Sequence, residues 1–232
     1  MFPLSNSRSS PKPLLCYVTD RRSLPGLVPE TSPAALLQKI EQVASAGVDW
    51  VQIREKDLAA GKLAALTRKI LQRVRAWSTA GGAVRILVND RLDIALAEGA
   101  GGVHLGEKSL PVEEAKRLVL LASPRSPAGA GFLLGVSGHS LEAARAAEGS
   151  GADYIFFGPV FATPSKAAFG EPQGVERLGQ VCRAVAIPVI AIGGITVENA
   201  TACLDSGAAG LAAIRLFQDA PDIPLLVSKL IG

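Results

Sequence analysis

A loop with hydroxyl groups and a lysine follows an apolar stretch in the second half of the chain. The apolar stretch is Tyr154–Phe157, and the loop runs from Gly158 to Lys166 and contains Thr163 and Ser165. A short apolar run of this kind is typical of a buried strand. Hydroxyl donors and a point charge on a loop beyond a parallel strand suit a bound phosphate. For this loop alone, a polar surface segment is the alternative.

A second polar group alternates along the predicted second strand. It consists of Gln52, Arg54 and Lys56, with Ile53 and Glu55 between them. A spacing of two places the first three on one face and the other two on the opposite face. A guanidinium and an ammonium on one inward face are costly unless an anion neutralises them. The pattern therefore predicts an anion site, and a ring of structural ion pairs is the alternative.

A carboxylate and a histidine end two further predicted strands. The third strand ends in Asn89 and Asp90, where a carboxylate beside an amide suits Mg²⁺ brought in with phosphate oxygens. Because a helix follows, an N-cap is the alternative for this pair. His139 follows the fifth strand and precedes a helix, where a cap or packing residue is the alternative to a catalyst.

A glycine pair and an arginine follow the last two predicted strands. Gly193 and Gly194 open a helix after the seventh strand, and Arg215 lies near the end of the eighth. Exposed N–H groups at a helix N-terminus are the usual phosphate cradle of barrels, and a plain tight turn is the alternative. Together with Arg54 and Lys166, these residues predict an enzyme that handles a phosphate or diphosphate ester.

The chain alternates between strand patterns and helix patterns, and the predicted elements have to position these residues. The predicted strands cover residues 14–20, 48–56, 84–89, 102–105, 132–136, 153–157, 188–192 and 210–214. The predicted helices cover residues 31–46, 60–80, 91–98, 111–121, 140–149, 174–185, 196–206 and 222–230. Eight such units in one length predict a single α/β domain, a (β/α)₈ TIM barrel over residues 14–232.

A recurrent glycine supports this interpretation. Residues 46–49, 98–101, 150–153 and 206–209 each place a glycine at a predicted helix end, just before the next strand. A doubly wound open sheet is the structural alternative. It lacks support because the first predicted strand is not followed by a G-x-G-x-x-G pattern.

Composition excludes several other classes of protein. The net charge is +3 and the basic residues are scattered, so a nucleic-acid partner is not expected. No apolar run approaches the ~20 residues of a membrane span. The three cysteines have no metal-binding spacing, and their odd number without a secretory signal predicts a cytoplasmic protein. Residues 1–13 are rich in Ser and Pro and are expected to form a flexible N-terminal tail.

From Leu14 to Phe217 the chain resembles the thiamine phosphate synthase/TenI family of thiamin biosynthesis. The resemblance rests on six motifs: Gln52–Lys56 (QIREK), Val88–Arg91 (VNDR), Val103–Gly106 (VHLG), Gly135–His139 (GVSGH), Gly158–Lys166 (GPVFATPSK) and Ala191–Ile195 (AIGGI). In the synthase branch, a hydroxymethylpyrimidine diphosphate loses diphosphate and the nitrogen of a thiazole phosphate attacks the resulting cation.

The synthase resemblance implies a role for each matching residue. The diphosphate would be held by Gln52, Arg54, Lys56, Asn89 and Lys166, and Asp90 would ligate Mg²⁺. The thiazole phosphate would be bound by Thr163, Ser165, Gly193 and Gly194, with Ser137 as a further substrate contact. The substrates implied are small phosphate and diphosphate esters, and a homo-oligomer is left open.

Two positions depart from the synthase pattern. Ser109 stands where synthases have a second metal-binding Asp, which leaves Glu107 as the nearest replacement ligand. Arg215 stands where a phosphate-binding Ser is usual, and an arginine there could grip the phosphate with two N–H groups.

Ser109 and the stretch Ser137–Glu142 look similar to the TenI branch, a thiazole tautomerase that needs no metal and would use His139 as its proton shuttle. Against this, Gly158–Pro159 matches the synthase branch, since TenI proteins tend to have Gly-His there. We therefore predict a synthase, with the tautomerase as the first alternative. A non-catalytic regulator that binds thiazole phosphate is the second alternative.

Overall fold

The computed structural model describes residues 12–26, 32–77, 84–122, 131–163 and 171–232. Its strands are β1 (Leu14–Val18), β2 (Trp50–Ile53), β3 (Arg85–Asn89), β4 (Gly102–Leu105), β5 (Leu133–Gly138), β6 (Tyr154–Phe157), β7 (Val189–Ile192) and β8 (Gly210–Ala213). Its helices are η1 (Arg21–Ser23), α1 (Ser32–Ser45), α2 (Ala60–Trp77), α3 (Leu92–Glu98), α4 (Val112–Ala122), α5 (Leu141–Gly149), α6 (Gly174–Ala184), α7 (Val197–Asp205), α8 (Arg215–Gln218) and α9 (Ile223–Ile231).

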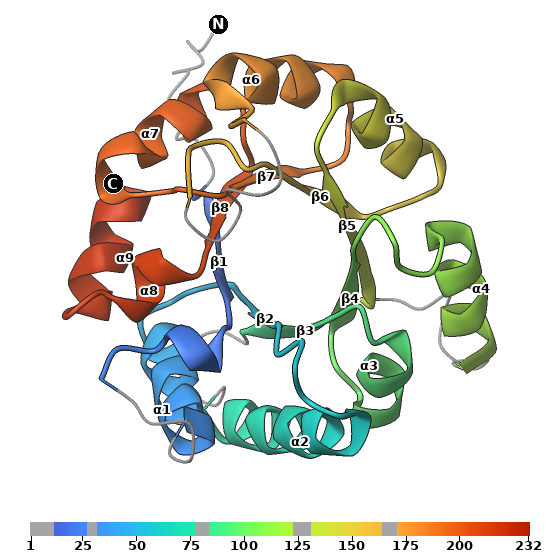
Figure 1. Ribbon diagram of the computed structural model, residues 1–232, viewed down its shortest axis with the longest axis vertical. Helices are drawn as coiled ribbons and strands as arrows, with labels where there is room; N and C mark the ends of the chain where they lie inside the picture. The colour runs from blue at the N-terminus through green and yellow to red at the C-terminus, as the bar shows by residue number, and fades with distance from the viewer. Residues whose placement is uncertain (1–11, 27–31, 78–83, 123–130, 164–170) are drawn as a thin grey trace, which may run out of the picture.

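The strands form a closed parallel barrel in sequence order, and the helices surround it (Figure 1). Closure comes from β1, which pairs with β2 on one side and with β8 on the other. Leu14 lies opposite Gly210 and Tyr17 opposite Ala213. The predicted TIM barrel is confirmed, and the open doubly wound sheet is excluded.

Each strand alternates between the barrel interior and the helical layer. Cys16 and Val18 of β1 pack inside the barrel with Tyr154 and Phe156 of β6. Their neighbours along the strands, such as Leu15 and Tyr17, pack outward against the helices. Most residues on both faces of the strands are therefore apolar, which is why the strands read as short hydrophobic runs in the sequence. Gln52 and His104 are buried polar exceptions.

The glycines at the predicted helix ends have the left-handed backbone that the pattern requires. Gly47, Gly99, Gly151 and Gly207 have φ values of 90°, 70°, 85° and 99°. An L-residue rarely adopts this conformation, whereas glycine does so at no steric cost. The repeated glycine motif thus marks each turn from a helix into the next strand of the barrel.

Four details of the predicted elements were wrong. β2 ends at Ile53, so Arg54 and Lys56 lie in the following loop and not on an inward strand face. β5 extends through Gly138 and includes Ser137. A short helix, α8, begins at Arg215 where the end of the eighth strand was expected, and η1 was not expected at all.

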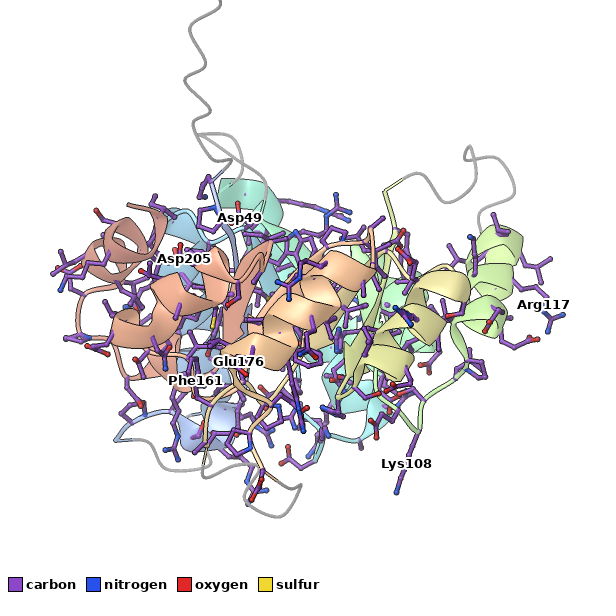
Figure 2. All side chains as sticks on the ribbon, turned by 90° about the horizontal axis from the view of Figure 1, so that it is seen from above. Asp49, Lys108, Arg117, Phe161, Glu176 and Asp205 are labelled. Carbon is purple, nitrogen blue, oxygen red and sulfur yellow. The ribbon has the colours of Figure 1, made fainter. Side chains whose placement is uncertain are left out.

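The loops after the strands gather at one end of the barrel. In Figure 2, Lys108 after β4 and Phe161 after β6 lie toward one face, while Asp49 before β2 and Asp205 before β8 lie toward the other. The first face is the mouth, where the active sites of such barrels are found. The second face holds Lys12, whose ammonium donates to Gly47 O over 3.0 Å.

No helix in the described ranges is long and apolar enough to cross a membrane. The expected tail of residues 1–13 lies mostly outside the described residues, which begin at Lys12. Its flexibility therefore stays a prediction.

The barrel interior gives a first testable prediction. A Cβ at Gly135 of β5 would lie 1.9 Å from the Cζ atom of Tyr154 on β6. Because Tyr154 is fully buried and cannot move aside, we expect Gly135→Ala to lower the free energy of unfolding by about 1–3 kcal/mol or more. Urea denaturation followed by circular dichroism measures the change.

Gly61→Ala is the matched control. Gly61 lies in α2, and a Cβ there would meet nothing within 4 Å. We expect this substitution to stabilise the fold by up to ~1 kcal/mol through helix propensity. An unfolding midpoint for Gly135→Ala equal to that of the parent would contradict the packing of the interior.

Candidate active site

The first polar contact at the mouth joins the ends of β2 and β3. The Gln52 amide, 2% exposed, donates to the Asn89 Oδ1 atom over 3.0 Å. A buried amide needs such a partner. The N-cap of α3 is Arg91, so Asn89 does not cap that helix. The structure therefore brings together these two residues, which were predicted to hold a diphosphate.

Two predicted cations and the predicted metal ligand lie within electrostatic reach of one another in the loops after β2 and β3. The charge of Arg54, followed by partial burial, lowers the pKa of Lys56, and the Asp90 carboxylate opposes this shift. Two neighbouring positive charges repel each other, so the pair is suited to receive an anion.

Glu55, between the two cations, is buried and binds the loop after β1. Its carboxylate accepts from the Thr19 hydroxyl over 2.6 Å, from the Arg21 backbone N–H, and from the Arg21 guanidinium over 2.9 Å. Arg21 also forms a two-pronged pair with Asp57, with distances of 2.7 and 2.6 Å. This arrangement agrees with Glu55 facing away from Arg54 and Lys56, and it gives Glu55 a role that the sequence did not reveal.

Asp90 is an exposed residue with a left-handed backbone, φ 66°, at the end of β3. Its carboxylate accepts a short hydrogen bond from the Ser109 hydroxyl. Ser109 in turn accepts from the Gly106 N–H over 2.7 Å. The N-cap of α3 is Arg91, so the Asp90 side chain is left for another role.

No group of three or more His, Cys, Asp or Glu residues within the described ranges could hold a metal ion. The predicted second ligand, Glu107, lies with its carboxylate 3.7 Å from the Nε2 atom of His139. The other ring nitrogen of His139 makes a short contact with the Gly158 carbonyl oxygen. His139 therefore connects the loops after β4, β5 and β6, and the cap of α5 is the next residue, Ser140.

A histidine that the motifs contained, but to which the sequence assigned no role, lies inside the barrel near its mouth. His104 of β4 is 3% exposed and stacks on Phe156 with ring centroids 4.3 Å apart. Its Nδ1 atom lies 3.2 Å from the Tyr154 hydroxyl, and its Nε2 atom lies 3.0 Å from the Ser137 hydroxyl. This contact orients Ser137, one of the predicted substrate contacts.

The glycine pair after β7 packs against the loop after β6. Gly193 and Gly194 have φ values of 95° and 66°. A Cβ on Gly193 would lie 2.6 Å from Pro159, and one on Gly194 would lie 2.6 Å from the Ala162 carbonyl oxygen. The Phe161 N–H donates to Gly193 O over 3.0 Å. Only glycines allow the two loops to approach this closely. The phosphate-binding role of this turn stays a prediction.

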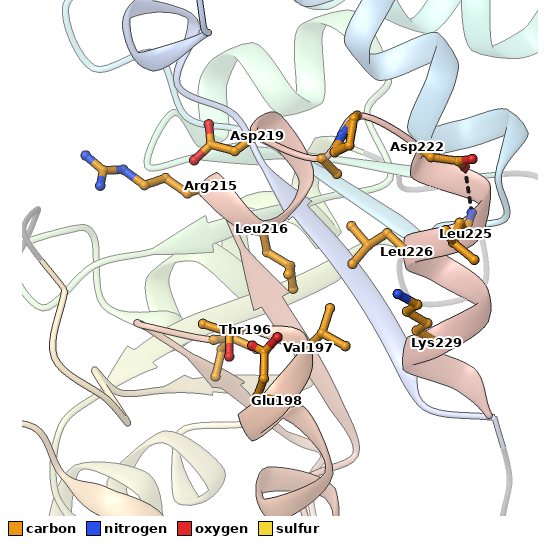
Figure 3. A pocket seen from close by; sticks show the side chains of 13 residues that line it. Thr196, Val197, Glu198, Arg215, Leu216, Asp219, Asp222, Leu225, Leu226 and Lys229 are labelled. Atoms are coloured by element: carbon orange, nitrogen blue, oxygen red, sulfur yellow. Dashed lines mark hydrogen bonds between the residues drawn. The ribbon is translucent and has the colours of Figure 1, made fainter.

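Arg215 is an exposed residue at the first position of α8. It lies at one end of a groove of about 450 Å³ formed by the start of α7, α8 and α9. Figure 3 shows its side chain pointing away from Leu226 and Lys229 at the other end of this groove. The mainly apolar groove is separate from the cations after β2, since neither Arg54 nor Lys56 lines it.

Part of the predicted site cannot be placed. Ser165 and Lys166 lie outside the described residues. Thr163 is described and partly buried, directly after the segment that contacts Gly194. The phosphate-binding roles of these three residues stay predictions.

Comparison with known proteins agrees with this arrangement. The family model described as "Thiamine monophosphate synthase" matches residues 17–217. The thiamine-phosphate synthase of Anaeromyxobacter dehalogenans is 40% identical over 202 residues, which are 87% of this chain and 84% of the relative. That of Roseiflexus castenholzii is 35% identical over 90% of this chain and 82% of the relative.

A solved structure is similar over nearly the whole length. The thiamine phosphate pyrophosphorylase from Pyrococcus furiosus superposes with a TM-score of 0.74 at 31% sequence identity, covering 94% of this chain and 93% of that protein. A barrel with these motifs at its mouth, matched over this length, identifies the relationship: the chain belongs to the thiamine monophosphate synthase family.

Proposed function

We propose that this chain is a thiamine-phosphate synthase that joins a hydroxymethylpyrimidine diphosphate to a thiazole phosphate and releases diphosphate. One observation carries the proposal. Arg54 and Lys56 follow β2 and Asp90 follows the adjacent strand β3, and the charges of Arg54 and Asp90 act in opposite directions on the pKa of Lys56. Two cations beside a carboxylate form a receptor for a diphosphate with its metal ion.

The leaving group determines what the residues must do. As the bond to the pyrimidine breaks, negative charge grows on the diphosphate. Arg54 and Lys56 neutralise this charge, and the amides of Gln52 and Asn89 orient the phosphate oxygens. The reaction needs no nucleophilic side chain, because the thiazole nitrogen attacks the pyrimidine cation directly.

The donor atoms present fit Mg²⁺. Magnesium usually keeps several waters and takes one or two carboxylates together with substrate phosphates. Asp90 supplies such a carboxylate, and the Ser109 hydroxyl holds one of its oxygens in place. When bound, Mg²⁺ would supply additional positive charge for the departing diphosphate. Glu107 stays a predicted second ligand.

The thiazole phosphate would bind on the opposite side of the mouth. The turn at Gly193 and Gly194 precedes α7, where backbone N–H groups and the helix dipole favour an anion. Arg215 would add a guanidinium from the neighbouring α8. The two substrates would then meet across the barrel axis, above the hydrogen-bonded pair of His104 and Ser137.

The synthase assay is the direct test. With both substrates and Mg²⁺, we expect diphosphate release that falls at least about 100-fold in Asp90→Ala, the scale seen when one group stabilising developing charge is removed. Asp93→Ala is the matched control, because Asp93 pairs with Arg91 on the surface of α3 and should leave the rate unchanged. Absence of turnover at every Mg²⁺ concentration would refute the synthase function.

The tautomerase alternative is favoured by the position of His139 beside Glu107 and by Ser109. It predicts metal-independent proton exchange on the thiazole carboxylate phosphate, followed by NMR in deuterated water. This exchange should be lost in His139→Ala. Binding of thiazole phosphate without either reaction would support the regulator.

Electrostatic coupling of the two cations gives a separate prediction. Because the charge of Arg54 is the largest cause of the lowered pKa of Lys56, Arg54→Gln should raise that pKa toward the ordinary lysine value. An NMR titration of the ¹³C-methylated lysines measures it. Arg22→Gln, on η1, should leave it unchanged.

The same coupling determines the pH dependence of binding. Pyrophosphate binds the protonated Lys56 better, so its affinity should fall as the pH rises through the pKa of Lys56. In Arg54→Gln the fall should move to higher pH. A fall at the same or a lower pH would contradict the proposed cation pair.

A cytoplasmic location and a homo-oligomer stay predictions.

A further inference from the structure

Glu55 is buried at the mouth of the barrel without belonging to the proposed substrate contacts. The residue is 4% exposed, and its carboxylate is held by several donors from the loop after β1. A buried carboxylate is stable only when it is fully hydrogen-bonded and paired with a charge. Thr19 and Arg21 provide both.

A first contact joins Glu55 to the backbone of Arg54. The Thr19 hydroxyl donates to Glu55 over 2.6 Å and accepts from the Arg54 N–H over 2.9 Å. Thr19 thus continues the hydrogen bonding between β1 and β2 beyond the last strand residue, with its side chain as acceptor. The backbone position of Arg54 therefore depends on a hydroxyl that Glu55 orients.

A second contact fixes the residue after Lys56. The guanidinium of Arg21 binds the carboxylates of both Glu55 and Asp57, at 2.9 and 2.6 Å. The two residues next to Lys56 in the sequence, Glu55 and Asp57, are therefore both bound to Arg21. A planar guanidinium that makes paired contacts restrains geometry better than a flexible ammonium could.

The loop that carries these anchors is itself fixed. Gln218 of α8, 2% exposed, donates to Asp20 O over 2.8 Å and to the Tyr17 hydroxyl over 3.1 Å. It also accepts from the Ser23 hydroxyl over 2.7 Å. Thr19 and Arg21, which hold Arg54 and Lys56, therefore belong to a segment that hydrogen bonds fix between β2 and α8.

Holding two like charges together without an anion has a cost. Repulsion between Arg54 and Lys56 favours conformations in which the loop moves them apart. Binding would then require the loop to be ordered first, which lowers the affinity. A backbone that is restrained on both sides of Lys56 keeps the loop ordered before binding and so removes most of this loss of affinity.

Building on the proposed function, we propose that Glu55 is a positioning residue, which acts through Thr19 and Arg21 to hold Arg54 and Lys56 in the geometry that receives the diphosphate. Glu55 itself contacts neither substrate. Its effect should be confined to the diphosphate side of the mouth.

Isothermal titration calorimetry with inorganic pyrophosphate and Mg²⁺ tests this role in the full chain. Glu55→Gln and Thr19→Val should each weaken pyrophosphate binding by about tenfold, the scale of one hydrogen bond involving a charged group. Thr19→Ser keeps the hydroxyl and should bind like the parent. The second probe is the thiazole phosphate substrate, which should bind equally to the parent and to all three variants.

Glu98→Gln is the matched control. Glu98 is also a largely buried carboxylate paired with an arginine, Arg68, but it lies at the far end of α3, away from the mouth. It should leave pyrophosphate binding unchanged. Circular dichroism melting of every variant separates loss of binding from loss of folding, and Thr19→Val remains informative if Glu55→Gln does not fold.

The remaining outcomes distinguish failure of the positioning role of Glu55 from failure of the proposed synthase function. Parent-like pyrophosphate affinity in both Glu55→Gln and Thr19→Val, with loss of binding in Arg54→Ala, would overturn the positioning role alone. Equal loss of both ligands would also overturn it, because it would indicate general damage to the mouth. A parent protein that does not bind pyrophosphate at all would overturn the proposed function as well.

Discussion

Pairing of β1 with β8 is the constraint on which the rest of the molecule depends. It joins residues at the two ends of the chain, such as Leu14 and Gly210. Closure leaves the barrel without an exposed sheet edge and forces all the loops after the strands to surround one opening. Gln218 extends the same closure to the loop after β1, across about 200 positions of sequence.

The mouth concentrates positive charge that the fold has to stabilise before any ligand arrives. The carboxylates of Glu55 and Asp57 offset the charge of Arg21, and Asp90 partly offsets that of Lys56. Arg54 and Lys56 still repel each other. An anionic substrate at the proposed site would relieve this repulsion, so a charge imbalance that costs stability in the free protein would favour binding.

The choice between the branches of the family depends on small changes near Asp90, the proposed metal ligand. Ser109 holds the Asp90 carboxylate by a hydrogen bond where a second carboxylate would have repelled it. Glu107, moved by two positions, lies beside His139 instead. A hydroxyl and a single carboxylate suit a magnesium ion that arrives with a diphosphate better than one bound by protein alone.

Local patterns were sufficient for the architecture and for the positions of several residues at the mouth. Alternating apolar runs and helix-end glycines predicted the barrel, because burial on both strand faces and left-handed turns impose residue types locally. The positions of Gln52, Asn89 and the pair Gly193–Gly194 followed, since parallel strands place their carboxyl ends together. The predicted strand through Lys56 was wrong, because β2 ends at Ile53 and the next residue, Arg54, donates its N–H to the Thr19 hydroxyl instead of to a backbone carbonyl.

Sequence alone thus determined the fold, the family and which residue types meet at the mouth. Tertiary structure decided how they are held there. Thr19 and Arg21 lie more than 30 positions before their partners Arg54 and Asp57, and His104 lies 33 before Ser137. Hydrogen bonds between such distant residues leave no periodic pattern in the chain, because they depend on the register of neighbouring strands and not on any local preference.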